Sequence, residues 1–197
     1  MRAKSPFEDL KDEHVSLLGE MTELVGRMRD MANPEKTALG GSAGVLRDGL
    51  EMFDHHLHTH FRREEEGLFP EAQRMISGGA QGADVFGRFF AEEAEDDMGA
   101  HATLSERTSK LLSILADLEA LGGVDEATSR KLLAIGNATA GLLQRHAAKE
   151  DSLIFPMIER SLTPGQVEQV SARLEKIGSA RDLTGESPEE GLSQLGG

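Results

Sequence analysis

Apolar side chains recur along most of this chain at intervals of three and four residues, the spacing of one face of an α-helix. The first such stretch covers about residues 6–31, where Ser5 suits the helix cap and Pro6 the first turn. Its apolar positions are Leu10, Leu17, Leu18, Met21, Leu24, Val25 and Met28, with His14 set among them. Alternating Val- and Ile-rich runs are missing, so the pattern predicts helices rather than a sheet.

The same periodicity predicts further helices at about residues 37–76, 83–121, 125–160 and 164–177. Gly-rich breaks near residues 78–79 and 122–123 separate them. Four long helices with short connections predict an all-α fold, an up-down-up-down four-helix bundle with a short C-terminal fifth helix. Residues 1–178 would form this one domain, and we expect the polar tail at residues 179–197 to be disordered.

Composition narrows the classes of function. The formal charge is 21 − 35 = −14, which argues against binding nucleic acid or an anionic membrane surface. The absence of cysteine excludes disulfides, iron–sulfur clusters and Cys-type zinc sites. No stretch approaches the roughly 20 apolar residues that span a bilayer, and the first residues lack the apolar core of a secretory signal. We therefore expect a cytoplasmic protein.

Two His-x-x-x-Glu sequences repeat each other at a separation of 146 − 60 = 86 residues, His60–Glu64 and His146–Glu150. In both copies an aliphatic residue, Phe and Pro follow at the same offsets, ending at Pro70 and Pro156. We expect each proline to kink or end its helix. An imidazole and a carboxylate four residues apart lie on one face of a helix, so each copy presents a nitrogen and an oxygen donor together.

The repeat extends to one histidine on the helix before each copy. His14 lies 46 residues before His60, and His101 lies 45 residues before His146. Four imidazoles and two carboxylates would then project from four helices into one core. Nitrogen and oxygen donors without sulfur suit iron, manganese or zinc, and iron is the commonest metal of paired sites in helical bundles.

These six positions resemble the hemerythrin-like, or HHE cation-binding, family over about residues 6–160. The resemblance implies that His14, His60, Glu64, His101, His146 and Glu150 bind two iron ions, joined by an oxo or hydroxo bridge. It also implies that the protein binds or senses O₂, nitric oxide or peroxide.

Two departures separate this chain from the oxygen-carrying hemerythrins. Those proteins place a second histidine four residues after the third-helix histidine, where this chain has Ser105. They also end the fourth-helix motif with Asp after a four-residue gap, whereas Glu150 follows a three-residue gap. Both departures favour the HHE branch implicated in nitric oxide, peroxide and iron handling over simple oxygen storage.

Counting donors bears on the chemistry. If Glu64 and Glu150 each bridge two irons and each iron takes two histidines, each iron has four protein donors. A bridging oxygen makes five, which leaves one open position on an octahedral ion, as a reactive metal needs. Three other functions stay open: an enzyme for peroxide disproportionation or nitric oxide reduction, an iron buffer or donor, and an interaction module with a vestigial site.

Several neighbours of the motif residues carry further expectations. His56 lies one turn before His60, where it is an extra ligand, a proton donor beside the site, or a buried histidine without ligation. Glu65, Glu66 and Asp151 are predicted as surface charge. Asp97 lies one turn before His101, where it is either a group beside the site or, as we expect, part of an exposed acidic face with Glu92, Glu93, Glu95 and Asp96. His55 and His58 are predicted to face solvent.

Overall fold

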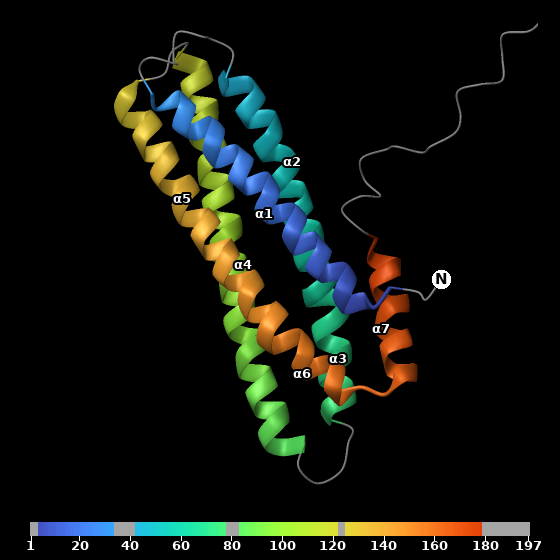
Figure 1. Ribbon diagram of the computed structural model, residues 1–197. Helices are drawn as coiled ribbons and strands as arrows, with labels where there is room; N and C mark the ends of the chain where they lie inside the picture. Colours follow the sequence, from blue (N-terminus) through green and yellow to red (C-terminus); the bar gives the residue numbers. More distant parts are fainter. Residues whose placement is uncertain (1–3, 34–41, 78–82, 122–124, 179–197) are drawn as a thin grey trace, which may run out of the picture.

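The computed structural model describes residues 4–33, 42–77, 83–121 and 125–178, and within these ranges all regular structure is helical (Figure 1). The all-α prediction is thus confirmed. The helices are α1 Pro6–Met31, α2 Ser42–Arg62, the π-helix η1 Arg63–Leu68, α3 Phe69–Ser77, α4 Ala83–Leu121, α5 Glu126–Lys149, the π-helix η2 Glu150–Ile154, α6 Phe155–Ser161 and α7 Pro164–Ile177. The tail predicted to be disordered, residues 179–197, lies outside the described residues. No described helix is long and apolar enough to cross a membrane.

Four long helices pack as a closed ring. α1 contacts α2 and α5, and α4 contacts the same two helices from the other side. Figure 1 shows these four helices running alongside one another, with α7 lying beside the N-terminal end of α1. Ser5 caps α1 as predicted and forms a capping box with Glu8, which fixes where that helix begins. α7 contacts η1, α1 and α3.

Two apolar cores fill the interior of this ring. One lies toward the 17–31 half of α1 and is built from Leu17, Met21, Leu24, Val25, Met28, Met31, Leu46, Leu50, Phe53, Leu57, Phe61, Leu104, Leu111, Ile114, Leu115, Leu118, Leu132 and Leu143. The other is built from Phe7, Leu10, Leu68, Phe69, Ala72, Phe90, Ile154, Phe155, Ile158, Val170 and Leu174. Each large side chain so buried contributes roughly 1.5–3 kcal/mol. Each of the four long helical segments (α1, α2–η1–α3, α4 and α5–η2–α6) contributes side chains to both cores. The predicted ligand histidines lie between the two cores.

Both helical segments that carry a His-x-x-x-Glu sequence contain a short π-helix, which includes the glutamate of that sequence. The amide of Phe69 donates to the carbonyl of Glu64, and the amide of Phe155 donates to that of Glu150, each five residues back. In both segments a proline comes directly after this phenylalanine. It has no amide hydrogen, and its ring crowds the carbonyl four residues earlier. A wider turn relieves that crowding. The prolines therefore do not end their helices, which was one of the two predicted outcomes, since the chain stays helical through both.

The C-terminal helix α7 supports the π-helix η1. Because Pro70 has no amide hydrogen, the carbonyl of Glu66 lacks its α-helical donor, and the Arg173 guanidinium of α7 donates to it at 3.1 and 3.3 Å. Gly67 of η1 faces α7 directly: a Cβ there would lie 2.5 Å from Leu174 Cδ2 and 3.0 Å from Ile177 Cδ1. The absence of a side chain at residue 67 thus lets α7 pack against η1.

We predict that Gly67→Ala lowers the free energy of unfolding by about 1–3 kcal/mol, because the added methyl group forces α7 away from η1. Gly19→Ala is the matched control, since a Cβ there meets nothing within 4 Å, and it should stabilise α1 by roughly 0.5–1 kcal/mol. Urea unfolding measures both changes. Equal stability of the two variants would show that the contact between α7 and η1 is not tight.

Candidate metal centre

The six side chains predicted as ligands meet between the two apolar cores. His14 comes from α1, His60 from α2, Glu64 from η1, His101 from α4, His146 from α5 and Glu150 from η2. All six are buried, with exposed fractions between 0% and 4%. A side chain of this polarity is placed so deeply only when it has partners, because burying an unpaired polar group costs free energy.

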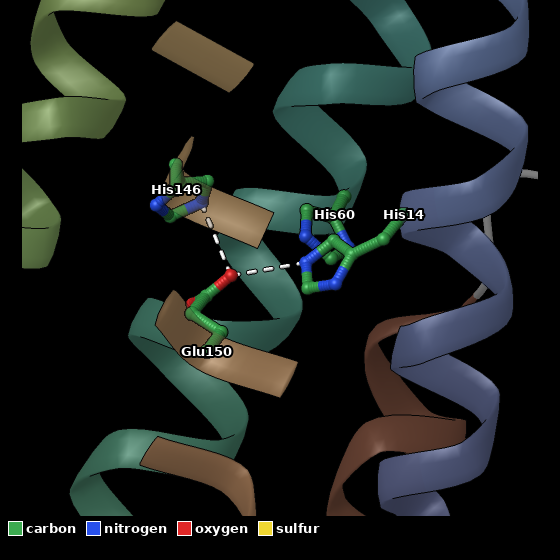
Figure 2. Close-up of side chains that lie close together, drawn as sticks. All are labelled: His14, His60, His146 and Glu150. Carbon is green, nitrogen blue, oxygen red and sulfur yellow. Dashed lines mark ion pairs between the residues drawn. The ribbon is translucent and has the colours of Figure 1, made fainter. Parts of the chain in front are cut away.

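Each glutamate lies between imidazoles from both halves of the repeat. Glu150 Oε2 is 3.0 Å from His14 Nε2 and 3.2 Å from His146 Nε2, as Figure 2 shows. Glu64 points one oxygen to each side. Its Oε1 is 3.3 Å from His60 Nε2, and its Oε2 is 3.3 Å from His101 Nε2. This is the arrangement that a carboxylate needs in order to bridge two cations.

Two overlapping groups of side chains could each hold a metal ion. One consists of His14, His60, His146 and Glu150, and the other of Glu64, Asp97, His101, His146 and Glu150. Within each group the ligand atoms lie within 4.8 Å of one another. All six predicted ligands therefore fall in these groups, together with Asp97.

Three of the four histidines are oriented by a carboxylate on their outer nitrogen. His14 Nδ1 lies 2.9 Å from Asp151, His60 Nδ1 lies 3.0 Å from Glu13, and His101 Nδ1 lies 2.7 Å from Glu65. With Nδ1–H donated outward, the lone pair of each Nε2 faces the interior, which is the tautomer that a metal ligand requires. Glu65 and Asp151 are partly exposed, but the prediction that they are only surface charge is wrong.

The partner of His60 belongs to a short chain of ion pairs. Glu13 also accepts from the buried guanidinium of Arg63, which pairs in turn with Asp9 at 2.8 Å. Asp9 is 44% exposed, so this chain links the outer nitrogen of His60 to the surface. Glu13 and Arg63 are not among the residues predicted from the sequence, although each directly precedes a predicted ligand.

Asp97 does not lie on an exposed acidic face as predicted. Its side chain is 1% exposed, with Oδ2 3.3 Å from His101 Nε2 and Oδ1 3.0 Å from His146 Nδ1. Neither oxygen is aligned for a hydrogen bond to these rings, and both lack a hydrogen-bond partner. Its position one turn before His101, on the same face of α4, favoured a place beside the site, which is the alternative that the structure supports.

His56 takes a position away from both groups of candidate ligands. Its Nδ1 lies 3.0 and 3.2 Å from the two carboxylate oxygens of Glu20 on α1, and its side chain is half-buried. His55 and His58 are exposed, as predicted.

The pKa values of the buried glutamates show that burial disfavours their charged forms, which a bound cation would stabilise. Burial raises the pKa of Glu64 to about 8, and burial together with the charge of Glu64 raises the pKa of Glu150 well above its usual value. Burial opposes a charge on His14, but the hydrogen bond to Asp151 and the negative charges of Glu150 and Glu64 outweigh it and raise the pKa of His14 to about 10. Burial and the charge of His14 lower the pKa of His60.

Unpartnered buried atoms support the same conclusion. His14 Nε2, His60 Nε2 and both oxygens of Glu64 and of Glu150 have no hydrogen-bond partner. All of them point into one space, and all are nitrogen or oxygen. The residues present therefore fit a first-row transition-metal ion, which binds such donors in preference to leaving them unpaired.

A scan against protein-family models gave no match for this chain, and a search of the curated proteins gave none either. The function must therefore be inferred from the site.

Removing one outer carboxylate should weaken metal binding without removing a ligand. Asp151→Ala deprives His14 of its acceptor, and we expect about 10–100-fold weaker metal affinity, measured by competition with a chromophoric chelator. Asp48→Ala, an exposed aspartate on α2, is the control and should leave the affinity unchanged. Unchanged affinity in Asp151→Ala would mean that this hydrogen bond does not orient a ligand.

The raised pKa values of Glu64 and His14 predict how the stability of the metal-free protein depends on pH. Between pH 6.5 and 8 the folded state keeps protons that the unfolded chain releases, so stability should fall as pH rises. The loss is up to about 1.4 kcal/mol per pH unit for each group. His60, whose pKa is lowered, acts in the opposite sense only below its ordinary value of 6.5.

Thermal melting of chelator-treated protein across this pH range measures the effect. Saturating metal should reverse the trend, because the ion competes with protons for the same atoms. Metal-free protein whose stability rises between pH 6.5 and 8 would contradict these protonation states.

Proposed function

We propose that this protein is a hemerythrin-like di-iron protein that binds or senses O₂, nitric oxide or peroxide in the cytoplasm. We also propose that its ring of α1, α2, α4 and α5 is an up-down-up-down four-helix bundle of that family. The observation that carries the proposal is that Glu64 and Glu150 each lie between imidazoles from the two halves of the repeat.

The donor set supports iron over other cations. Calcium and magnesium prefer all-oxygen sites, whereas four imidazoles with carboxylates suit iron, manganese or zinc. Paired carboxylate-and-histidine sites inside helical bundles are typical of di-iron proteins. When bound, a pair of irons supplies open coordination positions and reversible redox chemistry.

The surroundings of the site suit a small ligand. The ring of Phe61 stacks on His101 at a centroid distance of 3.8 Å, and the ring of Phe155 stacks on His14 at 5.6 Å. Both phenylalanines are buried members of the two apolar cores. These aromatic walls exclude water and leave the ligand histidines at most 4% exposed, which favours a diatomic molecule or peroxide over a bulky substrate.

One observation favours an enzyme as the second candidate. The chain from His60 through Glu13 and Arg63 to the partly exposed Asp9 joins a candidate ligand to the surface. Reduction of nitric oxide consumes protons, and peroxide disproportionation moves them between substrate molecules. A connection of this kind suits either reaction. The burial of the site argues against an iron donor, which must release its ion readily.

Spectroscopy and turnover assays separate these candidates. A binding or sensing protein should form a reversible adduct with O₂ or nitric oxide, seen as a new visible absorption band. An enzyme should evolve O₂ from hydrogen peroxide, or consume nitric oxide, over many turnovers. An iron donor should pass its iron to a metal-free acceptor protein, and a vestigial site should bind no iron.

We predict that Glu64→Ala and Glu150→Ala each lose both irons, because each carboxylate lies between both sides of the site. Glu66→Ala changes an exposed glutamate of the same π-helix and should keep two irons per chain, as should His56→Ala. Metal analysis after loading under excess ferrous iron gives the counts. Loss of a single iron from Glu64→Ala would show that this glutamate does not bridge, and loss of iron from His56→Ala would add His56 to the ligands.

A further inference from the structure

Asp97 breaks the internal symmetry of the site. The repeat relates His14 to His101, so the position one turn before His101 corresponds to the position one turn before His14. That position is Leu10, a fully buried member of an apolar core. Asp97 therefore brings a buried carboxylate to one half of the site, where the other half has an apolar side chain.

The contacts of Asp97 point to a role beyond orienting a neighbour. Glu13, Glu65 and Asp151 each make a hydrogen bond to the outer nitrogen of a histidine. Asp97 Oδ1 lies near His146 Nδ1, but without hydrogen-bond alignment, and Oδ2 lies 3.3 Å from the inward-facing His101 Nε2. Both oxygens are buried and unpartnered, and one of them lies among the atoms of the second candidate group.

We propose that Asp97 is a third carboxylate ligand, bound to the ion on the His101–His146 side of the site. This inference rests on the proposed di-iron function and adds to it that the two ions are inequivalent. The His101–His146 side then has five protein donors, which are two imidazoles and one oxygen each from Glu64, Glu150 and Asp97. The His14–His60 side has four, since Leu10 supplies none.

The unequal number of protein donors on the two sides determines where an external ligand binds. With iron bound, a fifth protein donor and a bridging oxygen would complete an octahedral shell on the His101–His146 side. The position left for exchange then lies on the His14–His60 side. Charge acts in the same direction, because a third carboxylate makes the His101–His146 side more negative and disfavours an anionic ligand there.

The experiment compares wild-type protein with Asp97→Ala and Asp97→Asn, using Asp96→Asn as the matched control. Asp96 is the preceding residue on α4, 78% exposed and paired with Lys149. All proteins are loaded with excess iron and oxidised, and then examined by Mössbauer spectroscopy and by titration with azide as the anionic probe. Melting of the metal-free proteins checks that each variant folds.

We expect wild type and Asp96→Asn to show two distinct quadrupole doublets of equal area and to bind one azide. In Asp97→Ala one doublet should shift while the other stays, and a second azide should bind. Loss of one whole iron from Asp97→Ala under excess metal would support the proposal too, since removal of an orienting group weakens affinity only about 10–100-fold.

Two results would overturn the proposal, and they are distinguishable. If Asp97→Ala keeps both wild-type doublets and binds a single azide, Asp97 only positions His146, while the di-iron function stands. If wild-type protein itself fails to bind two irons under excess metal, the di-iron function falls and this inference falls with it.

Discussion

Seven ionisable side chains buried between two apolar cores impose the constraint on which the rest of this structure depends. They are His14, His60, Glu64, Asp97, His101, His146 and Glu150. Their inward-facing nitrogen and oxygen atoms largely lack hydrogen-bond partners, and in water each would be solvated. Burying one unpaired charge costs several kcal/mol, so a cluster of this size must be stabilised by protonation, by ion pairing or by bound cations. On our account, bound metal turns the repulsion among these groups into attraction and joins the four long helices.

The elements around the cluster position these donors. Carboxylates outside the ring hold three of the histidines with Nε2 facing inward. Glu64 and Glu150 each lie where a long helix changes from α-helix to π-helix, and π-helical turns of this kind often occur at functional sites. α7 in turn packs against η1 and takes up the carbonyl that Pro70 leaves without a donor. The C-terminal helix α7 thus supports the site by contacting the backbone of η1, the segment that contains Glu64.

Much of this arrangement was predictable because the sequence contains an internal repeat of the residues that form the site. Helical periodicity located the helices, and the matching offsets of two His-x-x-x-Glu sequences brought six scattered residues into one hypothesis. Asp97 was expected on the exposed face because it lies in a run of acidic residues, where charge alone cannot distinguish the buried face of a helix from the exposed one. Pro70 and Pro156 did mark the π-helices, but a proline predicts only that an ordinary turn is disfavoured, not which alternative replaces it.

The most direct test of the account is a crystal structure of iron-loaded protein with anomalous diffraction recorded at the iron absorption edge. Two anomalous peaks should lie between the carboxylates of Glu64 and Glu150, one beside His14 and His60 and the other beside His101 and His146. A map without peaks there, or with these side chains turned to solvent, would contradict the claim that buried cations hold this cluster together.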